Sequence, residues 1–216
     1  MFGPLGNPLL DPKLVAESAG ISTTNKVPDA PSFVSKLDIV TYSNHMKLED
    51  VNVWDQYFSD PELTWEYRMG SEYGSRGNTF FIHPLKHDPW MPVLLSQIEN
   101  ITGLPLSEPN NVLDYYINGQ VIGQDGGIHA DTEHLQPWWT ILYFPMDWND
   151  EWGGPTKFFR SNLEFLMEVP VKRGNILCFP GNVLHQGCAP SIPNKMRMSV
   201  AIKTNLRFDV YPIKKY

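Results

Sequence analysis

Residues 174–187 read GNILCFPGNVLHQG, an apolar run that ends at a Pro-Gly pair and is followed by a histidine. A short apolar run between turn residues is typical of a buried β-strand. Similar runs occur at VLDYYI (112–117), WWTILYF (138–144), TKFF (156–159), FLMEVPV (165–171) and RMSVAIKTN (197–205). Turn residues such as Asn118-Gly119 separate these runs, so we predict an antiparallel β-sandwich or barrel.

The N-terminal half has a different pattern. Residues 48–58 and 91–102 place apolar side chains at helical spacing, and we expect both helices to pack against the β-rich half. Residues 1–36 are rich in Pro, Gly, Ser and Asn and are expected to form an extended arm. Residues 37–216 would then be a single domain, with its β-core at about 110–207.

The composition narrows the class of protein. The chain has 216 residues, enough for one domain with a sizeable core, and a net charge of −7, which disfavours binding to a phosphate backbone. Its two cysteines are too few for a disulfide framework or a four-cysteine zinc site. We find no secretory signal and no apolar run of membrane-spanning length. We therefore expect a soluble, cytoplasmic protein whose partner is neither a membrane nor nucleic acid.

One candidate metal site combines two separate stretches of sequence. His129 and Asp131 form an H-x-D motif just after Gly126-Gly127. On an extended backbone, residues i and i+2 point to the same side, so the imidazole and the carboxylate would converge. His185 would add a second imidazole from a neighbouring strand. Two histidines and one carboxylate form the facial set that binds Fe(II) and leaves coordination positions open.

A basic residue follows this candidate site. Arg197 lies on the last apolar run, where its planar guanidinium could bind a carboxylate through two parallel hydrogen bonds. Ser199 lies on the same face and could donate a hydrogen bond to the same carboxylate. Lys195 is the nearby alternative, as a point charge, and the sequence leaves the choice between Arg197 and Lys195 open.

The order of four motifs resembles a known family. HAD (129–131), WGGPTKF (152–158), GNILCFPGNVLH (174–185) and RMS (197–199) are similar to the Fe(II)- and 2-oxoglutarate-dependent dioxygenases, particularly the prolyl 4-hydroxylase-like branch. The resemblance covers about residues 110–207. It implies a mainly β fold, a double-stranded β-helix or jelly roll, with supporting N-terminal helices.

The resemblance also implies roles for individual residues. His129, Asp131 and His185 match the iron ligands, and Fe(II), 2-oxoglutarate as co-substrate and O₂ would be the cofactors, with ascorbate as a candidate reductant. Relatives that halogenate carry a small residue in place of the carboxylate ligand, so Asp131 favours hydroxylation.

Further matches concern the co-substrate. Arg197, or else Lys195, would pair with the distal carboxylate of 2-oxoglutarate. Thr156 matches a position near the co-substrate, and Tyr116 matches a tyrosine that hydrogen-bonds it. Many relatives carry a tyrosine where this chain has Phe144, which removes one hydroxyl from carboxylate recognition.

The implied activity is hydroxylation of a C–H bond in a peptidyl prolyl residue or an amino acid, with succinate and CO₂ as co-products. One alternative is an oxidative demethylase of alkylated nucleic-acid bases, whose relatives carry a second arginine where this chain has Lys203. The other is a non-catalytic, metal-binding jelly-roll module. Trp138, Trp139 and Trp152 would either pack in the core or form a substrate platform. The sequence identifies neither the peptide or small-molecule substrate nor the oligomeric state.

Overall fold

The computed structural model describes residues 38–69, 79–132 and 137–215. The arm predicted for residues 1–36 lies outside the described residues, so the domain boundaries stay a prediction. The two predicted helices are present as α2 (Leu48–Phe58) and α3 (Met91–Thr102). The strands are β1 (Val40–Tyr42), β2 (Glu66–Met69), β3 (Thr79–Pro84), β4 (Val112–Gln120), β5 (Trp138–Tyr143), β6 (Thr156–Phe159), β7 (Phe165–Val169), β8 (Ile176–Pro180), β9 (Leu184–Gly187) and β10 (Arg197–Arg207).

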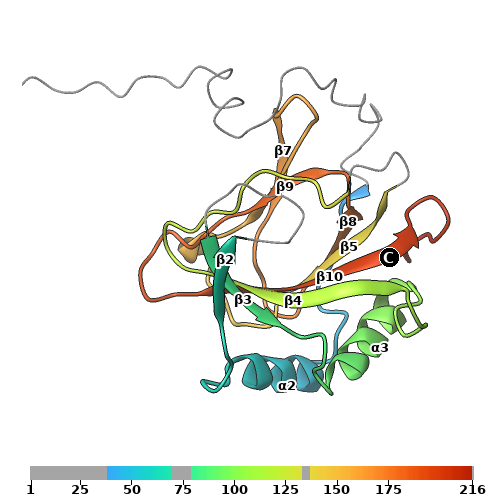
Figure 1. Cartoon of the computed structure of the whole chain (residues 1–216), viewed down its shortest axis with the longest axis horizontal. Coiled ribbons are helices and arrows are strands. Elements are labelled where there is room, and N and C mark those ends of the chain that lie inside the picture. The colour runs from blue at the N-terminus through green and yellow to red at the C-terminus, as the bar shows by residue number, and fades with distance from the viewer. Residues whose placement is uncertain (1–37, 70–78, 133–136, 216) are drawn as a thin grey trace, which may run out of the picture. The chain divides into compact units, whose positions relative to one another are not determined.

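Within the described residues, these strands form two antiparallel sheets. The larger sheet has seven strands in the order β1-β8-β5-β10-β4-β3-β2, and the smaller has three in the order β7-β6-β9. The longest strand, β10, lies between β4 and β5 in the larger sheet (Figure 1). The mainly β fold predicted from the sequence is confirmed.

The alternation of side chains along the larger sheet divides the core into two clusters. Successive residues of a strand point to opposite faces. The cluster on the helix side includes Ile117, Ile141, Ile176, Val200 and Ile202 from the sheet. The cluster on the other side includes Tyr116, Leu142, Leu177 and Ala201, together with Phe158 from β6 of the smaller sheet. Both faces of the larger sheet are therefore covered, which explains why its central strands read as continuous apolar runs.

The helices cover one face of the larger sheet (Figure 1). Trp54 and Phe58 of α2 and Leu94 and Ile98 of α3 belong to the helix-side cluster. The helix α3 ends at Gly103, whose φ of 80° is the left-handed conformation that glycine adopts at the end of a helix. Among the described residues, no helix has both the length and the apolar character needed to cross a membrane.

Leu94 offers a test of this packing. Its side chain is fully buried, whereas the preceding Val93 is 44% exposed. We expect Leu94→Ala to lower the free energy of unfolding by about 2–5 kcal/mol, because it leaves a cavity between α3 and the sheet. Val93→Ala should change it by less than about 0.5 kcal/mol. Urea denaturation of both variants measures the difference, and equal small losses would contradict the packing of α3.

The strand β4 is longer than predicted. Asn118-Gly119 was expected to be a turn, but β4 continues to Gln120 because Gly119 pairs with Met198 of β10 and with Phe81 of β3. A Cβ atom at Gly119 would lie 2.8 Å from the Trp65 ring. Glycine at this position therefore permits close packing within a strand and does not mark a turn.

Candidate metal centre

The backbone brings the two histidines of the candidate site together. His129 and His185 face each other in an isolated antiparallel bridge. The His129 N–H donates to the His185 carbonyl at 3.0 Å, and the His185 N–H donates to the His129 carbonyl at 2.9 Å. His185 lies on the short strand β9, in line with the expectation that its imidazole comes from a neighbouring strand. His129 and Asp131 lie outside the named strands, and the Asp131 N–H donates to the Gly181 carbonyl at 2.7 Å.

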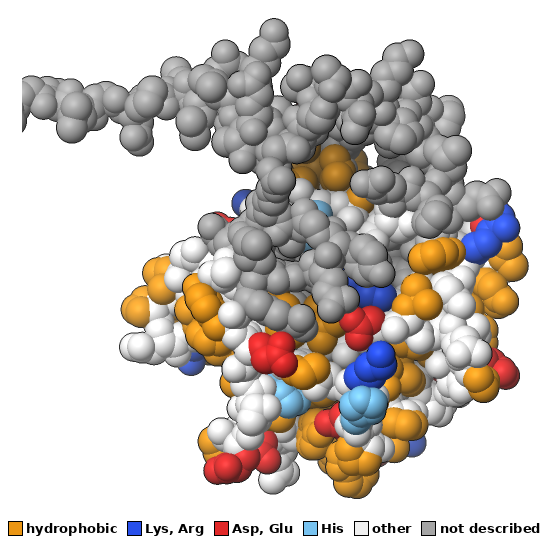
Figure 2. Space-filling view, viewed as in Figure 1, with side chains coloured by type: hydrophobic (Ala, Val, Ile, Leu, Met, Phe, Trp, Pro, Cys, Tyr) orange, Lys and Arg blue, Asp and Glu red, His pale blue; other side chains and the backbone are white. Residues whose placement is uncertain are grey.

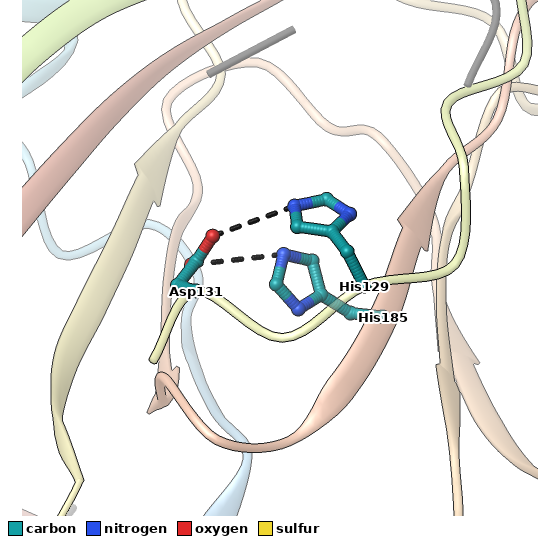
Figure 3. Close-up of side chains that lie close together, drawn as sticks. All are labelled: His129, Asp131 and His185. Carbon is teal, nitrogen blue, oxygen red and sulfur yellow. Dashed lines mark ion pairs between the residues drawn. The ribbon is translucent and has the colours of Figure 1, made fainter. Parts of the chain in front are cut away.

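The three side chains point toward one another (Figure 3). His129 Nε2 lies 3.4 Å from Asp131 Oδ1, and His185 Nε2 lies 3.7 Å from Asp131 Oδ2. The donor atoms of all three residues lie within 4.8 Å of one another. Since such ligands lie about 2.1 Å from a metal ion, donor atoms on one face are roughly 3 Å apart. Only small side-chain shifts would let the three bind one ion.

Both histidines hold the tautomer that a metal requires. His129 Nδ1 lies 2.9 Å from the Gly127 carbonyl oxygen, and His185 Nδ1 lies 2.9 Å from the Val183 carbonyl oxygen. A carbonyl can only accept, so each Nδ1 carries the hydrogen and each Nε2 keeps its lone pair. Burial lowers the pKa of His185 to about 3, so this imidazole is neutral at neutral pH. The donor set therefore fits a divalent transition metal.

Asp131 is held as an anion. Its Oδ2 accepts a hydrogen bond from Thr140 Oγ1 at 2.6 Å and forms an ion pair with Lys203 Nζ. Burial alone would raise the pKa of the Asp131 carboxyl. The positive charge of Lys203, together with the neighbouring imidazoles of His185 and His129, holds that pKa well below its usual range. Burial lowers the pKa of Lys203, but Asp131 outweighs this effect and raises it.

Arg197 is buried among neutral hydrogen-bond acceptors. Its Nε donates to the Gly154 carbonyl at 2.8 Å, and Nη2 donates to Thr156 Oγ1 at 2.9 Å. Nη1 donates to Gln120 Oε1 at 2.9 Å and to Ser199 Oγ at 3.1 Å. Burial lowers the pKa of Arg197 to about 10, so the guanidinium is still charged at neutral pH. Among the described residues, no carboxylate forms an ion pair with it, so an anion entering the pocket would find an unpaired buried charge.

Arg197 and the histidines line one pocket. Its walls include His129, His185, Tyr116 and Asn118, together with a row of alternate residues on β10: Arg197, Ser199, Ala201 and Lys203. The cavity volume is about 60 Å³, several times the roughly 10–15 Å³ that one water molecule needs. The predicted residues Tyr116, Thr156 and Ser199 all line this pocket.

Lys195 and Trp139 have other roles. Lys195 Nζ lies 3.9 Å from the centroid of the Trp152 ring, a cation–π contact, and Lys195 is not among the residues that line the pocket. Of the two candidate cations, the structure therefore places Arg197 in the pocket. Trp139 is 2% exposed and belongs to the helix-side core, so a platform role is wrong for this residue.

Gln120 and Lys203 are two of the pocket residues that the sequence analysis did not assign to the site. Gln120 lies beyond the turn that was expected at Asn118-Gly119, and its position on β4 follows from pairing with Arg197 on β10. Lys203 was considered only as a departure from the demethylases. The alternation that places Ser199 beside Arg197 also places Lys203 on the same face, and that signal could have identified it.

Comparison with solved structures identifies the fold. No protein-family model matches the chain, and no curated protein matches it in sequence. A prolyl-4-hydroxylase from Pseudomonas putida is similar at a TM-score of 0.58 and 13% identity, over 79% of this chain and 93% of that one. The α-ketoglutarate-dependent carbocyclase SnoK from nogalamycin biosynthesis is similar at a TM-score of 0.56 and 14% identity, over 85% and 84% of the two chains.

A third similar structure is a prolyl hydroxylase from Trichoplax adhaerens, solved with a peptide fragment of the hypoxia-inducible factor oxygen degradation domain. Its TM-score is 0.55 at 13% identity, over 76% of this chain and 82% of that one. The chain therefore has the double-stranded β-helix fold of the Fe(II)- and 2-oxoglutarate-dependent oxygenases. This confirms the fold that the four motifs implied.

Proposed function

We propose that the protein is an Fe(II)- and 2-oxoglutarate-dependent oxygenase that hydroxylates a C–H bond of a peptidyl prolyl residue or an amino acid. Succinate and CO₂ would be the co-products. The observation that carries this proposal is one pocket with two imidazoles and an anionic carboxylate at one end and the buried Arg197 at the other. A non-catalytic metal-binding module would have no need of a buried guanidinium without a carboxylate partner.

His129, Asp131 and His185 would hold the iron. Their Nε2 lone pairs and one carboxylate oxygen would occupy one face of the ion and leave the remaining positions open for co-substrate and O₂. When bound, the iron supplies the oxidising chemistry, with 2-oxoglutarate and O₂ consumed and ascorbate as a candidate reductant. The hydrogen bonds from each Nδ1 to a backbone carbonyl would keep both rings in position.

Arg197 would bind the distal carboxylate of 2-oxoglutarate. The guanidinium is already held in place by hydrogen bonds to Gly154, Gln120, Ser199 and Thr156. Binding of the carboxylate to Arg197 would therefore cost little side-chain entropy. Ser199 and Thr156 would act mainly through Arg197, while the Tyr116 hydroxyl would hydrogen-bond the co-substrate directly.

The substrate proposal rests on two of the similar structures being prolyl hydroxylases, one of them solved with a bound peptide fragment. Another similar structure, SnoK, is an α-ketoglutarate-dependent carbocyclase, so proteins of this fold are not all prolyl hydroxylases. Oxidative demethylation is less well supported. The net charge is −7, and on the described part of the face in Figure 2, basic side chains lie among acidic ones. The free thiols of Cys178 and Cys188 support a reducing, cytoplasmic location.

Two measurements test the proposed function. Anaerobic protein loaded with Fe(II) should develop a charge-transfer band when 2-oxoglutarate is added, since the co-substrate would bind the metal. Succinate formation should then be stimulated by proline-containing peptides or free amino acids. Stimulation only by methylated oligonucleotides would favour the demethylase. Neither a band nor succinate would leave the non-catalytic module as the better description.

A further inference from the structure

The Gly153-Gly154 turn links Arg197 to a tryptophan outside the pocket. The Arg197 Nε–H donates to the Gly154 carbonyl at 2.8 Å, and the Trp148 Nε1–H donates to the Gly153 carbonyl at 2.9 Å. Trp148 is not among the residues that line the pocket, whereas Arg197 is. Two hydrogen bonds to successive carbonyls therefore connect the indole to the guanidinium.

Both glycines of this turn have a backbone conformation that other residues rarely adopt. The φ angle is 70° at Gly153 and 74° at Gly154, in the left-handed region. A Cβ atom at Gly154 would lie 3.3 Å from Arg197 Cδ and 3.4 Å from Trp148 Cζ2, so both side chains approach the turn closely. Because glycine restricts the backbone least, contacts with neighbouring groups must fix the direction of the Gly154 carbonyl.

Trp148 is itself held by packing. Its ring is partly buried against the core cluster that includes Phe158, and it meets the Trp152 ring edge-on, with the ring centroids 5.3 Å apart. Lys195 Nζ lies over the Trp152 ring in turn. These contacts restrain the indole, so its N–H is a fixed donor to a turn that is intrinsically flexible.

We propose, on the basis of the function proposed above, that Trp148 is a positioning residue for the co-substrate. Its N–H fixes the Gly153 carbonyl and thereby the turn whose next carbonyl orients Arg197. An arginine side chain that is already oriented loses less side-chain entropy when it binds the distal carboxylate of 2-oxoglutarate. Trp148 therefore raises the affinity for the co-substrate without contacting it.

Trp148→Phe tests this role, because it keeps an aromatic ring and removes the N–H. 2-Oxoglutarate is titrated calorimetrically into protein that holds Mn(II), which can replace Fe(II) without oxidation. We expect the dissociation constant of 2-oxoglutarate to rise roughly fivefold, the scale of one protein hydrogen bond. The affinity for Mn(II) alone and the kcat of succinate formation at saturating 2-oxoglutarate should stay within about twofold of the wild type, whereas general damage to the fold would lower both.

A double variant shows whether Trp148 acts through Arg197. In an Arg197→Met background, Trp148→Phe should change the dissociation constant of 2-oxoglutarate by less than about twofold, because the group that Trp148 positions is already absent. Trp152→Phe is the matched control: it changes the neighbouring indole, keeps the hydrogen bond to Gly153 and should have an effect of less than about twofold. Gly154→Ala strains the turn at its positive φ. It replaces Trp148→Phe if that variant does not fold, and it should weaken binding at least as much.

The outcomes separate this role from the proposed function. A wild-type dissociation constant in Trp148→Phe, or in Gly154→Ala where that variant replaces it, would overturn the role of Trp148 and leave the oxygenase proposal standing. An equal rise in Trp152→Phe, or the same rise in the Arg197→Met background, would also overturn it, because loss of packing would then explain the effect without Arg197. Failure of the wild type to bind 2-oxoglutarate in the presence of Mn(II) would overturn both.

Discussion

His129→Ala and Asp131→Ala should each abolish 2-oxoglutarate turnover. Each variant removes one of three donor atoms that lie within 4.8 Å of one another, and the described residues that line the pocket include no further histidine, cysteine or carboxylate to replace it. Loss of an outer partner of a metal ligand already costs roughly 10–100-fold in metal affinity or activity. Loss of the ligand itself should therefore reduce succinate formation by more than about 100-fold.

His129→Ala is the cleaner of the two tests. Asp131→Ala leaves Lys203 largely buried without its partner, which costs up to about 3–5 kcal/mol of stability and could reduce activity through unfolding. His129 forms no comparable ion pair with Lys203, and its ring is partly exposed. His87→Ala, at an exposed histidine far along the chain from the site, is the matched control and should keep full activity.

Succinate formation and Mn(II) affinity should be measured on the same samples, after circular dichroism has shown that each variant is folded. Wild-type turnover in folded His129→Ala or Asp131→Ala would refute the ligand assignment. Loss of turnover with unchanged Mn(II) affinity would show that the residue acts on the reaction without binding the metal.

Arg197→Met should raise the KM for 2-oxoglutarate by roughly 30-fold or more. Removing one partner of a buried, hydrogen-bonded charge pair costs about 2–5 kcal/mol, and 1.4 kcal/mol corresponds to tenfold in affinity. The effect should fall mainly on KM, since Arg197 would bind the end of the co-substrate remote from the metal.

Lys195→Met is the matched control for Arg197→Met. Lys195 contacts the Trp152 ring and does not line the pocket, so its loss should change the KM for 2-oxoglutarate by less than about twofold. Steady-state titration of 2-oxoglutarate decides between the two cations. A large effect in Lys195→Met with none in Arg197→Met would reverse the assignment made from the structure. Arg197→Lys, which keeps the charge and loses the planar fork, should give an intermediate KM.

Local patterns in the sequence were sufficient to predict most of the secondary structure. The bounds predicted for α2 and α3 are those observed, and the strand predicted at 156–159 is β6. These elements bury one or both faces, so their apolar residues repeat with the period of a helix or strand. The H-x-D motif and His185 were also identifiable, because three metal-ligating residues in a fixed order stand out without any knowledge of contacts.

Tertiary contacts decided what local patterns do not encode. The short strand β9, which carries His185, is held by pairing with β6 and by the bridge to His129. The strand β4 passes through Gly119 because two neighbouring strands bind it on both sides. The ion pair between Lys203 and Asp131 joins residues far apart in the chain. The spacing of apolar residues along the chain indicates which side chains are buried. The partner of a residue on the neighbouring strand depends on the register between the strands, and that register is set only when the strands pair.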